Sequence, residues 1–512
     1  MNLLRSLATV SSMTLLSRIL GFVRDFVIAR SFGAGMLTDA FFVAFKLPNL
    51  LRRLFAEGAF SQAFVPVLGE YKNRYGANET RQLVDRVVSL LFLVVLGVTV
   101  LGMLAAPILV YVSAPGFAAD SAKFALTVEL TRITFPYILF MSLVAVAGGI
   151  LNTWSRFAVP AFTPVLLNLS LILMALFATP YFDPPIVALA WAVFLGGALQ
   201  PIFQIPSLAR LGMLPRFSLS LQDAGVRRIF RLMAPAVLGV SVAQVSLLLN
   251  SIFASFLNTG SVSWLYYADR LMEFPAGLLG AALGTILLPS LSKSHATGRH
   301  EEYSQLLDWG LRLTFLLAAP AALALAILAV PLVTTLFHHG AFTPNDVMRT
   351  REALVAYSIG LLGMILVKVL APGFYARQNV RTPVRIALLC LLVTQLLNLL
   401  LIPWLQHAGL ALAIGLAACL NAALLYRGLR RQGIYSPLSG WLGFYGKLAV
   451  GLLAMAAALW FSAGANDAWL SWGLAARLLR LSLVVGFGAT VYFATLWVAG
   501  FRLSDFRRRA AE

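Results

Sequence analysis

Apolar segments about 20 residues long recur from one end of this 512-residue chain to the other. A hydrocarbon layer about 30 Å thick requires about 20 apolar residues in each helix that crosses it. Only 12% of the residues are charged, whereas a water-soluble domain has about 25%. The chain therefore cannot cover its surface with polar groups, and most of it is predicted to lie inside a bilayer.

Charges, glycines and prolines divide the sequence into fourteen predicted membrane-spanning helices. The first series covers residues 9–31, 36–58, 84–114, 123–150, 157–179 and 185–209. The second series covers residues 226–256, 260–289, 304–337, 347–374, 383–403, 408–430, 441–463 and 474–499. An even number of spans places both termini on the same side of the membrane.

Lysine and arginine gather in alternate connections between these spans, and Lys123 and Arg349 are the clear exceptions. The cytoplasmic loops of membrane proteins carry such an excess, so these connections and both termini are predicted to be cytoplasmic. The net charge of +19 is thus spread over many short loops, a distribution that argues against a nucleic-acid-binding face. The residues concerned are Lys72, Arg74, Arg81, Arg156, Arg210, Arg216, Arg227, Arg228, Lys293, Arg299, Arg377, Arg381, Arg385, Arg427, Arg430, Arg431, Arg502 and Arg507 to Arg509.

Short matches at one constant offset indicate an internal duplication. Pro66 and Pro289 are 223 residues apart, and so are Pro160 and Pro383. Because six spans precede the second copy, the two copies start on the same side of the membrane and form a parallel repeat. The sequence therefore predicts an all-α protein with two six-helix lobes around a central cavity and two further C-terminal helices. The expected boundaries are 1–220, 221–435 and 436–512.

The first two predicted spans contain an unusual number of charges. One charge at the bilayer centre costs about 2.5–3.5 kcal/mol, so a group of them predicts a shared aqueous cavity or mutual pairing. Six residues place Arg24 about 240° around a helix from Arg18, so we predict a break at Gly21 that turns both toward one cavity. Arg30 and Lys46 are expected to reach the headgroups instead. The charged residues are Arg18, Arg24, Asp25, Arg30, Asp39, Lys46, Arg52, Arg53 and Glu57.

The second half repeats this pattern in the run from Tyr266 to Pro275, where Arg270 is the expected cavity-facing cation. Asp269 and Glu273 flank it and are candidates for substrate contact or for an internal ion cluster. Arg53 and Glu57 leave a similar choice, because i, i+4 spacing allows them to pair with each other.

Two single cations, Arg132 and Lys368, are expected to bind a carbonyl or to reach the headgroups. Guanidinium groups bind phosphate oxygens in pairs, so the arginine excess points to an anionic, phosphate-containing ligand. The sequence contains no phosphate-binding loop, His-Glu-x-x-His metal site or nucleophile triad. An enzyme, a cofactor and a metal are therefore not expected.

Long motifs in this sequence resemble the MurJ (MviN) family. They are Ser17 to Asp25, Thr38 to Arg53, Phe55 to Phe60, Tyr266 to Pro275, Gly284 to Leu291 and Ala371 to Tyr375. The resemblance covers essentially the whole chain. It implies that Arg18, Arg24, Asp39, Arg52 and Arg270 bind the substrate, with Ser17, Asp25, Arg53, Glu57, Asp269 and Glu273 as neighbours in the cavity.

The resemblance also implies a function. Members of this family belong to the multidrug, oligosaccharidyl-lipid and polysaccharide exporter superfamily, so a lipid II flippase of the bacterial inner membrane is expected. The arginines would engage the pyrophosphate, Asp39 would orient or periodically release an arginine, and helices at about 441–499 would hold the polyprenyl tail. Expected partners are lipid II, membrane lipids and the cell-wall synthesis and division machinery.

Two alternatives remain open from the sequence. One is another exporter of the same superfamily, either a drug or cation antiporter or a flippase for a different polyprenyl-linked glycan. A cation antiporter would need an acidic or apolar cavity, unlike the cationic one predicted here. The other is a membrane scaffold that organises cell-wall synthesis without transport.

Overall fold

The structure is a computed structural model that describes residues 3–53, 60–220 and 222–502. Within these residues the chain is helical and contains no β-strand. In this described part, ten helices are long and apolar enough to cross a membrane. The all-α membrane architecture predicted from the sequence is therefore confirmed. Glu57 lies outside the described residues.

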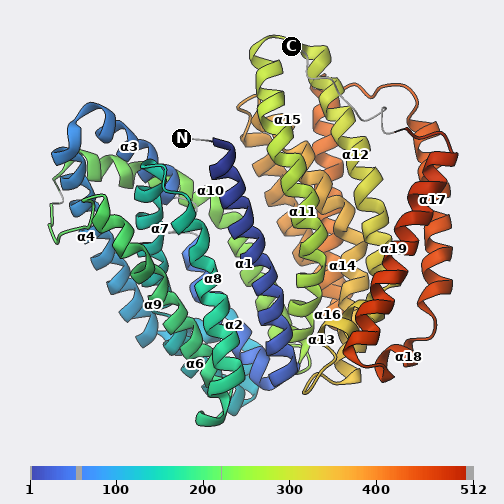
Figure 1. Cartoon of the computed structure of the whole chain (residues 1–512), viewed down its shortest axis with the longest axis horizontal. Helices are drawn as coiled ribbons and strands as arrows, with labels where there is room; N and C mark the ends of the chain where they lie inside the picture. Colours follow the sequence, from blue (N-terminus) through green and yellow to red (C-terminus); the bar gives the residue numbers. More distant parts are fainter. Residues whose placement is uncertain (1–2, 54–59, 221, 503–512) are drawn as a thin grey trace. The chain divides into compact units, whose positions relative to one another are not determined.

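The chain divides into two compact units, Met1–Ser263 and Trp264–Glu512 (Figure 1). Residues 221–255, which the sequence analysis assigned to the second lobe, lie in unit 1 in this division. The lobe boundaries at 220 and 435 stay a prediction.

Unit 1 is built from long helices that are interrupted where proline or a small residue breaks the apolar run. Ala105 separates α4 from α5 just before a proline, and Pro136 lies between α6 and α7. Its α-helices are α1 (Leu3–Phe32), α2 (Met36–Arg52), α3 (Ser61–Arg74), α4 (Gly76–Leu104), α5 (Ala106–Ser113), α6 (Ser121–Thr134), α7 (Tyr137–Thr153), α8 (Ala158–Leu173), α9 (Val187–Arg210) and α10 (Ala224–Ser255).

The first helix is not broken at Gly21. α1 runs without interruption over 30 residues, so the predicted break is wrong. A glycine inside a helix costs only about 1 kcal/mol relative to alanine, whereas an open backbone group in hydrocarbon costs several. The intact helix leaves Arg18 and Arg24 about 240° apart around its axis.

Unit 2 contains the remaining helices, the first of which begins in the last residues of unit 1. They are α11 (Ser261–Ala296), α12 (His300–Ile327), α13 (Ala329–Phe337), α14 (Pro344–Leu370), α15 (Pro372–Tyr375), α16 (Arg381–Arg431), α17 (Trp441–Ala463), α18 (Asn466–Ser471) and α19 (Leu474–Val498). α16 contains a kink at Gln406, where φ is 49° and ψ is −127°. This kink falls between the predicted spans 383–403 and 408–430.

Small residues let α14 and α16 pack closely. A Cβ atom built on Gly360 would lie 2.1 Å from the Cα of Gly415, so this contact requires glycine. Membrane helices commonly associate through such small residues, because apolar side chains gain little by leaving lipid.

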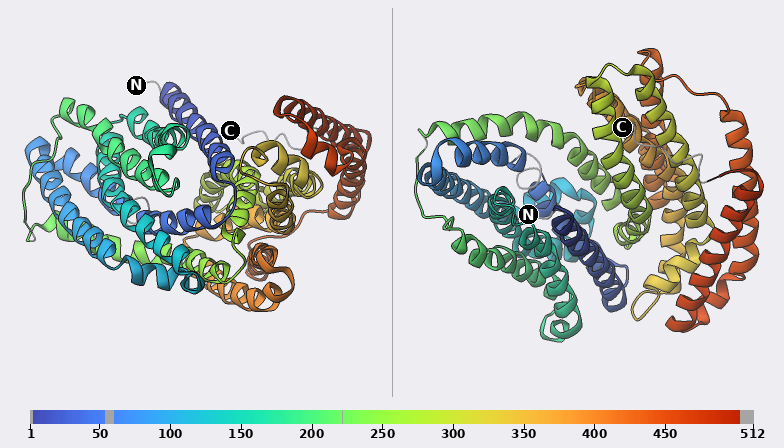
Figure 2. Two further views of the ribbon diagram at one scale, coloured as in Figure 1. Left: turned by 90° about the horizontal axis from the view of Figure 1, so that it is seen from below. Right: turned by 45° about the horizontal axis from the view of Figure 1, so that its top comes forward.

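α17 and α19 run alongside each other in both further views (Figure 2). A buried cluster that includes Phe444, Leu448 and Tyr492 packs them against α12. The hydroxyl of Tyr492 donates a hydrogen bond of 2.7 Å to the carbonyl of Leu316. The C-terminal helix pair is thus attached to unit 2 by both apolar packing and a buried hydrogen bond.

Candidate functional site

Arg24 lies in the C-terminal half of α1 and is held by two neighbours. Its Nε and Nη2 atoms donate to Oδ1 of Asp25 at 2.9 and 2.7 Å. Its Nη1 atom donates to Oδ1 of Asn168 in α8 at 3.1 Å. The side chains of Arg24 and Asp25 are only 11% and 3% exposed. Burial of this kind requires paired charges, because an isolated charge would lose its hydration without compensation.

Asn168 connects the guanidinium to the backbone of the same helix. Its Nδ2 atom donates to the carbonyl of Ser17 at 3.1 Å, while its Oδ1 accepts from Arg24. The Cβ position of Gly21 is 4.0 Å from Nδ2. The amide therefore fixes both the rotamer of Arg24 and the position of α1 against α8. Sequence analysis missed Asn168, whose signal is a lone amide in the apolar run 157–179.

The other predicted residues of α1 and α2 lie in different surroundings. Arg18 is exposed and forms no hydrogen bond or ion pair with the part of the chain that the structure describes. Arg52 donates through Nε to Oδ1 of Asn49 at 2.8 Å, one turn earlier in α2. Arg53 is exposed. Arg18 and Arg53 thus keep their guanidinium groups accessible, whereas Arg24 is enclosed.

Asp39 is completely buried and accepts from several donors. Its Oδ2 atom receives Nζ of Lys123 at 2.9 Å and the backbone N–H of Gly260 at 2.7 Å. Its Oδ1 atom receives the backbone N–H and the hydroxyl of Ser263 at 2.9 and 2.7 Å. The predicted arginine partner is wrong: the cation is Lys123 of α6. The carboxylate joins α2, α6 and the first turn of α11.

This ion pair also explains why Lys123 departs from the charge pattern of the loops. Lys123 is 4% exposed and lies inside α6 rather than in a connection. Its Nζ atom also lies 4.1 Å from the ring centre of Phe117. The lysine is therefore a buried partner of a carboxylate and carries no information about orientation.

Two further lysines pair within the protein. Nζ of Lys368 donates to the carbonyl of Ala276 at 3.0 Å, which is the first of its two predicted alternatives. Nζ of Lys46 donates to the hydroxyl of Ser251 in α10 at 2.8 Å. The expectation that Lys46 reaches the headgroups is wrong, because a hydroxyl from another helix satisfies it inside unit 1.

Arg270 lies in α11 within unit 2 and remains open to water. Its Nη1 atom is 2.9 Å from Oε2 of Glu273, and the two side chains are 36% and 51% exposed. The guanidinium carbon lies 5.0 Å from the ring centre of Tyr266. Asp269 precedes the arginine and is half-buried. Arg270 and Glu273 thus pair with each other, and the choice between substrate contact and an ion cluster that includes Asp269 stays open.

The structure therefore groups the predicted residues into three sets. The first is Arg24 with Asp25 and the backbone of Ser17, and the second is Asp39 with Lys123; both lie in unit 1. The third is the Arg270 and Glu273 pair of unit 2. In the described ranges, no group of three or more His, Cys, Asp or Glu side chains could hold a metal ion.

A family model described as lipid II flippase MurJ matches residues 28–480 of this chain. A Burkholderia cenocepacia protein named lipid II flippase MurJ is 52% identical over 518 residues, covering 100% of each chain. A Vibrio cholerae protein named probable lipid II flippase MurJ is 46% identical, covering 99% of this chain and 98% of its own.

Solved structures show the same fold. One of lipid II flippase MurJ in an inward closed conformation aligns with a TM-score of 0.79 and 25% identity, covering 95% of this chain and 99% of the other. An inward-facing multidrug transporter of the MATE family aligns with a TM-score of 0.68 and 13% identity, covering 83% and 98%. The chain is a multi-pass inner-membrane protein and belongs to the lipid II flippase MurJ family.

Proposed function

We propose that this protein transports lipid II from the cytoplasmic to the periplasmic leaflet by alternating access. The observation that carries the proposal is Arg24, an arginine enclosed in an apolar helix and held ready by Asp25 and Asn168. A structural cation in hydrocarbon needs one strong partner, whereas an anion-binding guanidinium needs a fixed orientation. The full-length relatives named lipid II flippase support the same substrate.

Four arginines are proposed to contact the pyrophosphate of lipid II. Arg18, Arg24, Arg52 and Arg270 are the proposed contacts, because guanidinium forks match phosphate oxygens in bidentate geometry. At Arg24 the phosphate competes with Asp25 for the guanidinium, which permits release as well as capture. A cytoplasm-negative potential favours outward movement of the anionic head by about 2.3 kcal/mol per charge per 100 mV.

Asp39 would act on the site as a positioning residue. Its carboxylate binds Lys123 and two backbone N–H groups at the start of α11, the helix that also carries Arg270. We therefore propose that Asp39 fixes the first turn of α11. Ser17, Asp25, Arg53, Glu57, Asp269 and Glu273 remain proposed neighbours of the substrate.

The finer topology is also a proposal. We propose fourteen spans in two lobes of six plus the α17 and α19 pair, with both termini in the cytoplasm. The kink at Gln406 supports counting α16 as two spans, and the basic connections support the orientation. Exposed apolar side chains on α17 and α19, among them Leu453 and Leu479 at 71% and 65%, suit a polyprenyl tail.

The test follows lipid II at the periplasmic face of cells that are depleted of their own flippase and supplied with this protein. Wild type should restore export, whereas Arg24→Ala and Arg270→Ala should not at equal membrane abundance. Arg299→Ala is the matched control, because Arg299 also forms an exposed i, i+3 pair, with Glu302, but lies before α12. Normal export by both site variants would contradict the proposal.

A further inference from the structure

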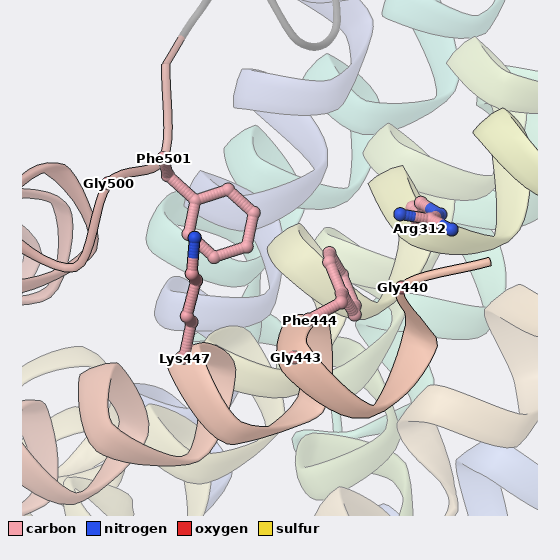
Figure 3. A pocket seen from close by; sticks show the side chains of 7 residues that line it. All are labelled: Arg312, Gly440, Gly443, Phe444, Lys447, Gly500 and Phe501. Carbon is pink, nitrogen blue, oxygen red and sulfur yellow. The ribbon is translucent and has the colours of Figure 1, made fainter.

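A cavity of about 270 Å³ lies between α12, the first turns of α17 and the residues that follow α19 (Figure 3). Arg312 and Lys447 line it together with Phe444 and Phe501, and glycines form much of the remaining wall. None of these residues is among the proposed pyrophosphate contacts. Two cations around one cavity indicate an anionic ligand.

Arg312 is fixed before any ligand arrives. Its Nε donates to Oδ2 of Asp308 at 2.8 Å, and its Nη2 donates to the carbonyl of Ser439 at 2.9 Å. The guanidinium also lies 4.9 Å from the ring centre of Trp441. Its Nη1 atom has no acceptor among the residues that the structure describes. One nitrogen of a fixed guanidinium is thus left for an external acceptor.

Asp308 is the counter-ion of Arg312 and is also held by neutral donors. Its carboxylate is 1% exposed, and Oδ1 accepts from the Tyr435 hydroxyl, the Trp441 indole N–H and the Leu438 backbone N–H. The carboxylate therefore serves to orient Arg312 rather than to occupy the anion position.

Lys447 supplies the second cation and is exposed on α17. Across the described chain it forms no hydrogen bond or ion pair, and its Nζ lies 5.5 Å from the ring centre of Phe501. Two glycines near it, Gly440 and Gly500, adopt left-handed backbone conformations with φ angles of 89° and 86°. A Cβ atom on Gly500 would lie 3.5 Å from Nζ. That is an ordinary van der Waals distance, so the positive φ rather than lack of space favours glycine at this position.

Exposed apolar side chains lie close in sequence to the lining residues, which favours a lipid over a soluble anion. Leu442, next to Gly443, is 92% exposed, and Trp497 and Val498, just before Gly500, are 64% and 79% exposed. α17 begins and α19 ends here, and two consecutive spans return the chain to the same membrane surface. A charged cavity above exposed apolar side chains matches a headgroup above its acyl chains.

We propose that this cavity binds the phosphodiester of an anionic phospholipid, with Arg312 and Lys447 as the phosphate contacts. Its volume lies just below the usual range of about 300–1,000 Å³ for small-molecule pockets, which suits a headgroup rather than a whole lipid. Basic pockets between helices at the cytoplasmic surface are known to favour such headgroups. The site would attach the α17 and α19 pair to the lipid boundary.

The test measures lipid binding by mass spectrometry of the intact, detergent-solubilised protein. Phosphatidylglycerol should bind more tightly than phosphatidylcholine. Lys447→Gln should weaken phosphatidylglycerol binding by about fivefold, as expected for one lysine at an anionic surface, and Lys447→Glu should weaken it further. Lys447→Arg should retain binding. Arg430→Gln is the control, because Arg430 is a basic residue at the end of α16 and does not line the cavity.

Four results would overturn the proposal. Equal phosphatidylglycerol affinity of wild type and Lys447→Glu would remove the lysine from the site. Equal affinity for phosphatidylcholine, or binding of inorganic phosphate as tight as that of the lipid, would exclude an anionic phospholipid as the ligand. Loss of lipid II binding in Lys447→Glu with phosphatidylglycerol binding unchanged would assign the cavity to the transported substrate.

Discussion

Two of the ion pairs that involve predicted cavity residues differ most clearly in their access to water. In unit 1, the side chains of Asp39 and Lys123 are 1% and 5% exposed. In unit 2, those of Arg270 and Glu273 are 36% and 51% exposed. The first pair is satisfied by protein donors, whereas the second can exchange partners with a ligand. Charges that look equivalent in the sequence therefore have different roles. One pair is buried and links helices, and the other is exposed and accessible to a ligand.

The largest expected effect is on the buried pair. Asp39→Asn would leave Lys123 without its counter-charge, and breaking a buried pair costs about 3–5 kcal/mol. The measurement is the thermal unfolding of the purified protein in detergent. The double variant Asp39→Asn, Lys123→Met should recover part of this loss, since no uncompensated charge remains. Equal unfolding temperatures for wild type and Asp39→Asn would contradict the buried connection.

Asn168→Ala should come next. It removes a hydrogen bond to a charged group, worth about 1.5–3 kcal/mol, and frees the Arg24 side chain. We expect lipid II translocation to slow by about tenfold or more, with Asn168→Asp, which keeps an acceptor for Arg24, less affected. Translocation rates in vesicles, normalised to folded protein, provide the comparison. A rate in Asn168→Ala equal to wild type would show that Arg24 needs no such support.

The accessible pair should affect stability little. Exposed pairs contribute about 1 kcal/mol or less, so Arg270→Ala and Glu273→Ala should unfold near the wild-type temperature. Their transport should differ, because only Arg270 is proposed to contact pyrophosphate. Matched loss of transport in both variants would instead favour the ion pair itself as the functional unit.

The smallest expected effect concerns His338, which lies in the connection between α13 and α14, outside the candidate spans. Nη2 of Arg477 donates to its Nδ1 at 3.1 Å, which requires a neutral acceptor. Burial, followed by the charges of Arg477 and His339, lowers the pKa of His338 below its ordinary value of 6.5. Its contribution to stability is therefore present above pH 6.5 and lost as the pH falls.

Hydrogen exchange of α18 tests this expectation, because Arg477 also binds the carbonyl of Leu470. Exchange corrected for intrinsic rates should accelerate between about pH 7.5 and pH 5.5 in wild type but not in His338→Gln. Identical acceleration in both proteins would rule out His338 as the titrating group.

The sequence predicted the features that depend on composition and local charge. The apolar runs predicted the helical membrane architecture, and one of the two expectations for Lys368, a carbonyl partner, is confirmed. Contacts between distant helices were not predictable. Asn168 is 144 residues from Arg24 and Lys123 is 84 from Asp39, and nothing in their local sequence specifies either partner.

The error at Gly21 has a physical lesson. Its small side chain permits a bend, but a helix in hydrocarbon must keep its backbone hydrogen bonds. A glycine that allows a bend therefore does not predict one, because the cost of unpaired backbone groups in the bilayer keeps the helix intact. The charge exception at Lys123 was a usable signal, because a cation that breaks the loop pattern is a candidate for a buried pair.

The initial rate of lipid II translocation in vesicles that contain only purified protein tests the central claim most directly. Without other cell-wall proteins, a scaffold would show no transport. We predict that wild type and Arg299→Ala translocate lipid II at similar rates, and that Arg24→Ala and Arg270→Ala are slower by about tenfold or more at equal folded amounts. Wild-type rates in both site variants would contradict arginine-dependent transport.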